Sequence, residues 1–443
     1  MKEKISFTSL GCAKNLCDTE VMLNLLSKEG FEIVPDAEDA DVVVVNTCAF
    51  IEDAKRESID TILDLAWLKK NHTLRGIVVT GCMAERYREE LLSEMPEIDA
   101  LLGIGSESKI VGAVRAVLDG KSGISDIGDK AGCPLGGDRV VTTGDAMAYL
   151  KIAEGCSNRC AYCAIPMIRG PLRSRTVEDI VAEARDLDAL GIKELCLIAQ
   201  DTSAYGIDLY GEYALPRLIR AITDATRIPW IRLLYCYPDK ITDELVSEIR
   251  DNDRVVKYID IPIQHITDRM LRAMNRHGDR AMIEDAVRRL RGAVPGIVLR
   301  TTLIVGFPGE TGEDFEELCR FVKETEFDRL GAFTYSREED TPAYSFPDQI
   351  DEDTKARRYD ALMKTQLRIS EKKMKKRIGK TVPVLTESFD PVAETYVGRT
   401  AGEAPDVDGK VFFTASRPVS EGEITDVLIT DAMDYDLVGK VVI

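Results

Sequence analysis

Three cysteines lie close together in this chain, at a spacing that suits a metal centre. Cys156, Cys160 and Cys163, here called the barrel cysteines, form the pattern CxxxCxxC directly after a strand-like run. A closed zinc site needs a fourth ligand, and no His or Cys supplies one at finger spacing. A 4Fe-4S cluster bound by three thiolates keeps one iron open for chemistry. The pattern therefore favours such a cluster over zinc or three ordinary thiols.

Three further cysteines are far apart in sequence, but each one ends a strand-like run. They are Cys12, Cys48 and Cys82, here called the N-terminal cysteines. In a parallel sheet such strand ends share one edge, so the thiolates can converge. Gly11 and Gly81 beside them would let the backbone approach closely. Strand-end cysteines are often plain core thiols, and the presence of the barrel cysteines is what favours a second three-thiolate cluster here.

The composition is that of a globular protein with several domains. The chain has 443 residues, of which 44% are hydrophobic and 30% charged, which fits two to four domains. No run approaches the roughly 18 apolar residues of a membrane span, and the first residues lack a signal-peptide core. We therefore expect a cytoplasmic protein without membrane contact. Thiols stay reduced there, so eleven cysteines indicate metal or redox chemistry.

The net charge of −19 is concentrated at the two ends of the chain. Residues 1–120 contain 13 Lys and Arg against 22 Asp and Glu, and residues 378–443 contain 5 against 12. Acidic surfaces repel phosphate backbones and attract basic proteins. Extended nucleic-acid binding is therefore disfavoured, and a basic protein partner is favoured.

The first part of the chain alternates apolar strand-like runs with amphipathic helical stretches, which predicts a parallel α/β domain over 1–119. We expect its strands at 5–10, 41–45 and 76–80, and its helices at 18–30 and 52–70. In the second helix, one apolar face is expected to comprise Ile59, Ile62, Leu63 and Ala66. A glycine-rich stretch then predicts a linker over 120–147.

Six βα-type units follow, which predict a second domain over 148–377. Their strand-like runs lie at 149–153, 195–199, 230–234, 257–262, 297–305 and 329–334. This series fits an open, partial (β/α)6 barrel better than a flat sheet, and ligands would gather at the carboxyl ends of its strands. Short strand-like runs between turns over 378–443 predict a small all-β barrel. The expected fold class is α/β with a small C-terminal β domain.

Seven motifs spread over the chain complete the pattern. They are SLGCAKNL at 9–16, VNTC at 45–48, GC at 81–82, CSNRCAYCAIP at 156–166, RGPLRSR at 169–175, IPIQH at 261–265 and IVGFPGE at 304–310. Together they resemble the radical S-adenosylmethionine (SAM) methylthiotransferases. The resemblance implies an N-terminal methylthiotransferase domain, a radical SAM barrel and a C-terminal TRAM domain, which match the three parts predicted above.

The resemblance also implies the cofactors. The barrel cysteines would bind a 4Fe-4S cluster that cleaves SAM to a 5′-deoxyadenosyl radical, and the N-terminal cysteines would bind a second 4Fe-4S cluster that delivers sulfur. The radical would take a hydrogen from an unactivated carbon, and another SAM would supply the methyl group. An electron donor such as a flavodoxin or a ferredoxin is implied as a partner.

Two motifs, GCAKNL at 11–16 and LLYCYP at 233–238, resemble one branch of the family. That branch methylthiolates the β-carbon of an aspartate in ribosomal protein S twelve, whereas close relatives modify adenosine in transfer RNA. The acidic C-terminal domain agrees with a basic protein substrate, and the tRNA activity is the alternative. A plain iron–sulfur electron carrier is disfavoured, because carriers normally complete each cluster with four protein ligands.

Four other side chains are candidates for SAM binding. Tyr162 lies inside the cysteine loop and resembles the aromatic residue near adenine, although it could equally pack in the core. Gln200, Gln264 and Arg300 lie in or at the ends of predicted barrel strands, where polar groups can bind the carboxylate and ribose of SAM, or bind nothing. One departure from the family pattern is Asp340, where glycine is expected; a positive φ there would cost some stability.

Overall fold

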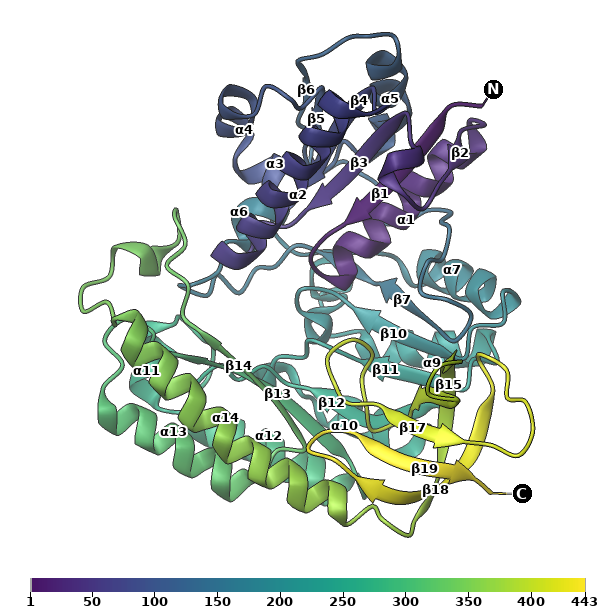
Figure 1. The fold of residues 1–443 in the computed structure, drawn as a ribbon. Helices are drawn as coiled ribbons and strands as arrows, with labels where there is room; N and C mark the ends of the chain where they lie inside the picture. Colours follow the sequence, from purple (N-terminus) through teal and green to yellow (C-terminus); the bar gives the residue numbers. More distant parts are fainter. Residues whose placement is uncertain (1, 443) are drawn as a thin grey trace.

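The computed structural model describes residues 2–442, which form an N-terminal sheet domain, a central partial barrel and a C-terminal β barrel (Figure 1). The N-terminal sheet is six-stranded and parallel, in the order β2-β1-β3-β4-β5-β6. Its central strands β3 and β4 are buried along their whole length, as expected for parallel strands covered by helices on both faces. The elements are β1 (Lys4–Ser9), α1 (Ala13–Lys28), β2 (Glu32–Ile33), β3 (Val42–Thr47), α2 (Glu52–Asn71), β4 (Gly76–Gly81), α3 (Cys82–Arg86), α4 (Arg88–Glu94), β5 (Ala100–Leu102), α5 (Ile110–Leu118) and β6 (Ile124–Asp126).

The segment predicted as a linker over 120–147 begins with a strand. Gly120 and Gly123 have φ values of 80° and 69°, and together they turn the chain into β6, which pairs with β5 at the edge of the sheet. The expectation that regular structure stops at Gly120 is therefore wrong for these residues, because glycine here forms a turn rather than a flexible stretch. No further helix or strand of the described chain lies between β6 and residue 147.

Helix α2 also differs from expectation, in the face that it buries. Ile62 and Leu65 are buried against the sheet, whereas Ile59 and Leu63 are exposed by 36% and 50%. The sequence predicted that Ile59, Ile62 and Leu63 share one apolar face. The face that meets the sheet is rotated away from Ile59 and Leu63, so α2 carries apolar side chains on its outer side.

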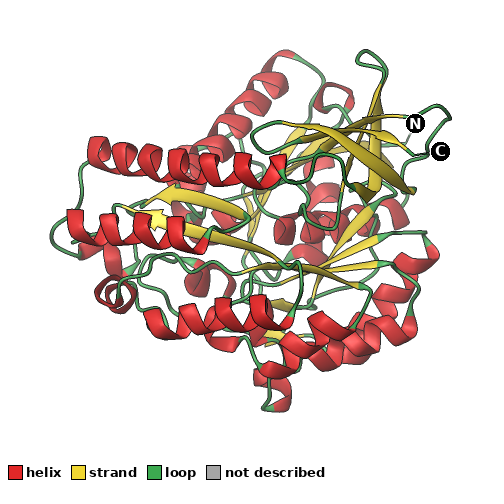
Figure 2. Ribbon diagram, turned by 90° about the horizontal axis from the view of Figure 1, so that it is seen from below, coloured by secondary structure: helices red, strands yellow, loops and turns green. Residues whose placement is uncertain are grey.

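The central domain is a second six-stranded parallel sheet, in the order β14-β13-β12-β11-β10-β7 (Figure 1). Figure 2 shows the strands of the molecule in yellow and its helices in red. Because neighbouring strands follow one another in sequence, every right-handed crossover adds a helix to the same face, and the sheet curves into a partial barrel. Its elements are β7 (Met147–Lys151), β8 (Ala153–Glu154), α6 (Ile165–Arg169), β9 (Arg173–Ser174), α7 (Val177–Ala189), β10 (Glu194–Ile198), α8 (Ile207–Tyr210), α9 (Leu215–Ala225), β11 (Trp230–Leu233), α10 (Asp243–Asp251), β12 (Val255–Asp260), α11 (Asp268–Ala273), α12 (Arg280–Ala293), β13 (Val298–Val305), α13 (Gly312–Thr325), β14 (Arg329–Thr334) and α14 (Glu352–Lys375).

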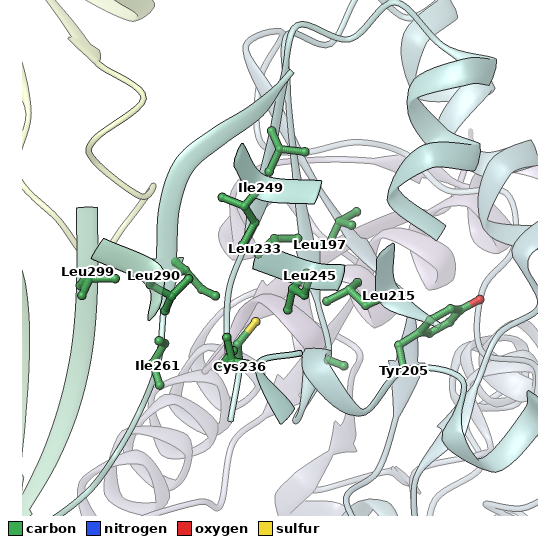
Figure 3. Packing of buried hydrophobic residues seen from close by; sticks show 14 of the residues in the cluster. Leu197, Tyr205, Leu215, Leu233, Cys236, Leu245, Ile249, Ile261, Leu290 and Leu299 are labelled. Atoms are coloured by element: carbon green, nitrogen blue, oxygen red, sulfur yellow. The ribbon is translucent and has the colours of Figure 1, made fainter. Parts of the chain in front are cut away.

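The helices of this domain pack on the outer face of the sheet and form the largest core of the protein. Figure 3 shows Leu197 and Leu233 from the sheet beside Leu245 and Ile249 of α10 and Leu215 of α9, all of them buried. Burying a leucine side chain of this kind contributes about 1.5–3 kcal/mol to folding. This core holds the strands rigidly, and so fixes the loops at their carboxyl ends.

The C-terminal domain is a closed five-stranded barrel in the order β15-β16-β17-β19-β18. Its strands are β15 (Thr381–Asp390), β16 (Thr395–Arg399), β17 (Val411–Thr414), β18 (Ile424–Ala432) and β19 (Leu437–Val441). The predicted fold class, α/β with a small all-β barrel at the end, is confirmed. In the described chain, no helix has both the length and the apolar composition needed to cross a membrane.

The inner face of the partial barrel is filled by the other two domains. Tyr149, Cys196 and Tyr258 on the strands pack against Leu16 of α1 and Ala404 of the C-terminal domain. The hydroxyl of Tyr149 donates a hydrogen bond to Asp406 over 2.6 Å, and that of Tyr258 donates one to Asp408 over 2.7 Å. The open side of the barrel is thereby closed by side chains from both neighbours.

Buried ion pairs join the C-terminal domain to the barrel. Glu403 accepts hydrogen bonds from Arg329 on β14 over 2.6 Å and from Arg377 after α14. Burial alone would raise the pKa of Glu403, but the charges of Arg377 and Arg329 outweigh it and lower the pKa to about 2. At pH values above the ordinary pKa of glutamate, the carboxylate therefore stabilises the folded state. This stabilisation is lost as the pH falls towards 2.

Replacing this carboxylate should loosen the C-terminal domain. Glu403→Gln leaves two buried guanidinium groups without their charge partner, so we expect a loss of about 3–5 kcal/mol of unfolding free energy at pH 7. The loss should shrink as the pH falls from 4.5 towards 2, because unfolding then lets this carboxyl group take up a proton. Calorimetric unfolding at pH 7 and at pH 3 measures this difference. Glu423→Gln, which removes a surface ion pair with Arg417 in the same domain, should change little, and equal effects of both variants would contradict the prediction.

Candidate active site

The barrel cysteines lie in a loop at the carboxyl end of the curved sheet, directly after β7 and β8. Cys156 and Cys160 are buried and Cys163 is half-buried. The loop is anchored at both ends by backbone hydrogen bonds, from Cys156 N to Gly170 O over 3.1 Å and from Ala161 N to Met274 O over 2.9 Å. All three sulfur atoms are thus held at the position where ligands bind in such folds.

Two side chains contact two of these sulfur atoms, Asn158 from the cysteine loop itself and Arg276 from the loop after α11. Asn158 donates to Cys156 Sγ over 3.4 Å and to Asp201 over 2.7 Å. The guanidinium of Arg276 lies 3.7 Å from Cys160 Sγ and 4.1 Å from the ring centre of Tyr237. Arg276 is buried, so its positive charge acts on the thiols through a poorly screened medium.

Burial also changes the chemistry of the thiols themselves. It raises the pKa of Cys156 to about 11 and that of Cys163 to about 12, and the neighbouring thiolate charges of this loop add to both shifts. Three negative charges in this place therefore require positive charge among them. Iron binding provides that charge and displaces the thiol protons.

The N-terminal cysteines meet at one edge of their sheet, as the sequence predicted. Thr47 pairs with Gly81 across β3 and β4, so Cys48 and Cys82 follow neighbouring positions on adjacent strands. A side-chain carbon on Gly11 would lie 2.9 Å from Cys48 Sγ, which places the loop of Cys12 directly against Cys48. Cys82 begins α3 and Cys12 directly precedes α1. Burial raises the pKa of Cys82 to about 12, so a thiolate there needs positive charge beside it.

The side chains available in both groups are the donors that an iron–sulfur cluster uses. Within residues 2–442, no three His, Cys, Asp or Glu side chains are grouped as the ligands of one metal ion would be. A 4Fe-4S cluster binds each thiolate through a different iron atom, so its ligands stand farther apart than those of one zinc ion. The donor set of three thiols in each group suits such a cluster.

One arginine connects the two groups of cysteines. Arg169 ends α6, the helix that follows the cysteine loop, and is fully buried. Its Nη2 lies 3.6 Å from Cys82 Sγ and donates a hydrogen bond to Asn15 of α1. Its Nη1 donates to Asp18 over 3.0 Å and to Glu154 over 2.9 Å. Arg169 therefore joins Cys82 to Glu154, two residues before Cys156, in one buried ion-pair network.

The candidate SAM-binding residues occupy different environments. Tyr162 makes an edge-on contact with Phe307, with ring centres 6.5 Å apart. Gln200 donates to Glu154 over 2.7 Å. The side-chain oxygens of Gln200 and Gln264 are buried and have no hydrogen-bond partner in the described structure, so each can accept a hydrogen bond from a ligand. Arg300 is instead held by Asp260 over 2.9 Å and by Asp408 over 3.6 Å.

Lys14 places a further positive charge between the two sites. Its ammonium lies 3.0 Å from the ring centre of Tyr235, which is itself at the end of β11, and the residue is buried. Burial lowers the pKa of Lys14 to about 8, while the neighbouring charge of Cys12 opposes that shift. The cation–π contact stabilises the ammonium where solvent cannot.

The sequence analysis did not single out Lys14, Asn158, Arg169, Tyr237 or Arg276. Four of them lie within the motifs or the cysteine loop quoted above, so proximity to a motif could have indicated them. Arg276 follows α11 outside any motif, and only the fold brings it to Cys160. The doubtful residue Asp340 does have a positive φ of 62°, so the turn has the geometry for which glycine is favoured.

Known proteins resemble this chain over its whole length. Three family models match: Uncharacterized protein family UPF0004 at residues 4–103, the Radical SAM superfamily at 150–322 and the TRAM domain at 378–442. A protein of Acetivibrio thermocellus named Ribosomal protein uS12 methylthiotransferase RimO is 48% identical over 452 residues, covering 100% of this chain and 99% of its own. The RimO of Geobacter sulfurreducens is 48% identical with the same coverage, and that of Clostridioides difficile is 48% identical over 99% of this chain and 98% of its own.

This chain belongs to the RimO family. It is accordingly a radical SAM methylthiotransferase, with an N-terminal UPF0004 domain, a radical SAM domain and a TRAM domain. The RimO relatives cover the chain end to end, so all three domains are part of the family's architecture.

Solved structures with a similar fold are more distant. TsrM from Kitasatospora setae, a radical S-adenosylmethionine methyltransferase with cobalamin and a 4Fe-4S cluster bound, has a TM-score of 0.54 and 16% identity over 77% of both chains. OxsB, a cobalamin-dependent S-adenosylmethionine radical enzyme, has a TM-score of 0.52 and 14% identity, covering 84% of this chain and 56% of its own. At these identities the likeness concerns the fold alone.

The close approach of the strands at the N-terminal cysteines can be tested with a glycine. Gly81 has a φ of 92°, and a side-chain carbon there would lie 2.2 Å from Asn46 Oδ1 and 2.6 Å from Thr47 O. Gly30 has a φ of 91° with nothing within 4 Å. Gly30→Ala should therefore lose only about 1 kcal/mol through backbone strain, whereas Gly81→Ala should lose several times more. Denaturant unfolding of both variants measures this, and equal losses would contradict the packing.

Proposed function

We propose that this RimO-family enzyme methylthiolates the β-carbon of an aspartate in ribosomal protein uS12, the S twelve protein of the sequence analysis. The observation that carries the proposal is the presence of two three-cysteine groups joined through Arg169, which contacts Cys82 and pairs with Glu154, two residues before Cys156. Relatives with 48% identity over the whole chain carry uS12 methylthiotransferase in their names. The acidic C-terminal domain favours a basic protein as substrate.

Each cysteine group is proposed to bind one 4Fe-4S cluster. When bound, the cluster on the barrel cysteines supplies the electron that cleaves SAM to a 5′-deoxyadenosyl radical, and the cluster on the N-terminal cysteines supplies the sulfur. The electron donor is proposed to be a flavodoxin or a ferredoxin, and the reaction to occur in the cytoplasm. A second SAM provides the methyl group.

The protein's own side chains position the reactants. Arg276 and Asn158 hold Cys160 and Cys156 in fixed orientations, and Arg276 offsets the negative charge of the thiolates. The unpartnered oxygens of Gln200 and Gln264 are proposed to accept hydrogen bonds from SAM, and Tyr162 to pack against its adenine. Arg300 is already paired with Asp260 and Asp408. We propose that Arg300 orients the SAM carboxylate, while the two aspartates hold its guanidinium in place.

Burial of the site protects the reactive intermediates. The inner face of the barrel is closed by α1 and by the stretch 401–408 of the C-terminal domain. These contacts exclude water from the inner face of the barrel. A radical needs such a site, because side reactions with solvent or stray hydrogen donors would quench it.

Substitutions in the two cysteine groups should stop different steps of the reaction. Cys156→Ala should abolish release of 5′-deoxyadenosine, because SAM loses its cluster. Cys48→Ala should spare that release but stop sulfur insertion, and each variant should bind about four iron atoms in place of about eight. Anaerobic iron analysis, chromatography of 5′-deoxyadenosine and mass spectrometry of uS12 measure these results.

A matched control is Cys319→Ala, which removes a half-buried thiol on α13 and should leave iron binding and turnover intact. Methylthiolation retained by Cys48→Ala would overturn the second-cluster assignment.

The substrate itself is tested by direct competition. Reconstituted enzyme with SAM, sulfide and reductant is offered uS12 and bulk tRNA in one vessel, and both are analysed by mass spectrometry. A methylthio group on a uS12 aspartate is the expected product. The same group on a tRNA adenosine, with uS12 unchanged, would overturn the proposed function in favour of the tRNA-modifying activity.

A further inference from the structure

Helix α2 presents an apolar stripe to solvent on the outer side of the N-terminal domain. Ile59, Leu63 and Trp67 are exposed by 36%, 50% and 59%, and their spacing of four residues places them in one row about 12 Å long. Phe50, just before the helix, is exposed by 40%. An exposed tryptophan in an apolar row is unusual on a free surface and typical of a protein-binding surface.

A row of carboxylates runs beside this stripe. Asp53, Glu57, Asp60 and Asp64 are all exposed on α2, and their spacing places them together on the helix side next to the apolar row. The ion pairs of α2 in the described chain join Lys55 to Glu52 and Glu338, and Lys69 to Asp99, so they do not neutralise this row. Four like charges along one helix repel each other, and a cationic partner would relieve that repulsion.

The position of α2 relates the stripe to the active site. Cys48 lies four residues before the helix, and the backbone nitrogen of Glu52 at its start lies 3.5 Å from Ser336 in the loop after β14. Arg86, beside Cys82, forms a buried ion pair with Glu338 of the same loop over 3.0 Å. The first turn of α2 is therefore fixed against the loop after β14, where the N-terminal domain meets the barrel (Figure 1).

We propose that the outer side of α2 is the docking surface for the substrate protein, with Ile59, Leu63 and Trp67 as its apolar centre and Asp53, Glu57, Asp60 and Asp64 as its charged border. The proposal rests on the proposed function and names where the rest of the substrate binds while its aspartate enters the site. A ribosomal protein is basic because it binds RNA phosphates, so it matches the carboxylate row, whereas RNA would be repelled by it. A partner seated on α2 lies on the domain that holds Cys48 and Cys82, next to the loop after β14 that the first turn of the helix contacts.

Binding to purified uS12 tests the surface directly. Holoenzyme carrying Leu63→Ser and Trp67→Ser should bind uS12 at least about tenfold more weakly by titration calorimetry, because apolar interface centres carry most of the affinity. Asp60→Lys with Asp64→Lys should weaken binding most at low salt and flatten its salt dependence. Matched controls on the barrel are Leu190→Ser, an exposed leucine, and Asp186→Lys with Asp224→Lys, two exposed carboxylates; these should bind as the wild type does.

A short peptide containing the target aspartate separates docking from chemistry. The peptide cannot span from the site to α2, so its KM should be equal in wild type and α2 variants, while the KM for whole uS12 rises in the variants with kcat unchanged. Unchanged uS12 binding by both α2 variants would overturn the proposal. So would an equal rise of the KM for the peptide and for whole uS12, or variants that lose only the binding of tRNA. Wild-type enzyme that modifies neither peptide nor protein would overturn the proposed function instead, and the binding data would still decide the docking surface.

Discussion

The arrangement of the whole enzyme depends on one buried group of charges. Arg169 and Lys151 pair with Asp18 and Glu154 in the interior between the N-terminal domain and the barrel. Asp18 comes from α1, while the other three come from the segment around the barrel cysteines. Removing one member of such a network leaves a buried charge uncompensated, at a cost of about 3–5 kcal/mol, so the two domains are held in one relative position. Because Arg169 also contacts Cys82, this interaction sets the separation of the two cysteine groups.

Two parallel sheets make that arrangement possible. In each sheet the cysteines follow the carboxyl ends of strands, where loops are free to carry chemistry and the strands provide rigidity. The N-terminal sheet directs its strand ends at the barrel, and α1 continues into the barrel's inner face with Leu16 and Cys17. Cys82 and the segment before Cys156 therefore contact the same buried arginine, Arg169. A reaction that needs a radical and a sulfur atom at the same carbon requires this closeness.

Much of this could be predicted from the sequence, because strand runs, motif spacing and turn residues are local signals. The order of the six central strands, the C-terminal barrel and the meeting of Cys12, Cys48 and Cys82 follow from alternating βα units and the rule for parallel strand ends. The buried face of α2 could not be predicted, since the helix has apolar residues on two sides and only packing decides between them. Strand β6 could not be predicted because glycines precede it, and the role of Arg276 could not be predicted because the residue lies far from any motif. Such residues are positioned by tertiary contacts, which leave no local pattern.

The charges of the enzyme are separated between its outside and its interior. The chain has a net charge of −19, yet Lys14, Arg169 and Arg276 are buried beside the cysteines. The cations in the interior offset the negative charge of thiolates in a medium that screens poorly, where each charge has a large effect. The carboxylates on the surface act at longer range through solvent and raise the rate at which a basic protein approaches. The same chain can therefore attract a cationic substrate to its surface and still stabilise anionic ligands within its site, because water screens one set of charges from the other.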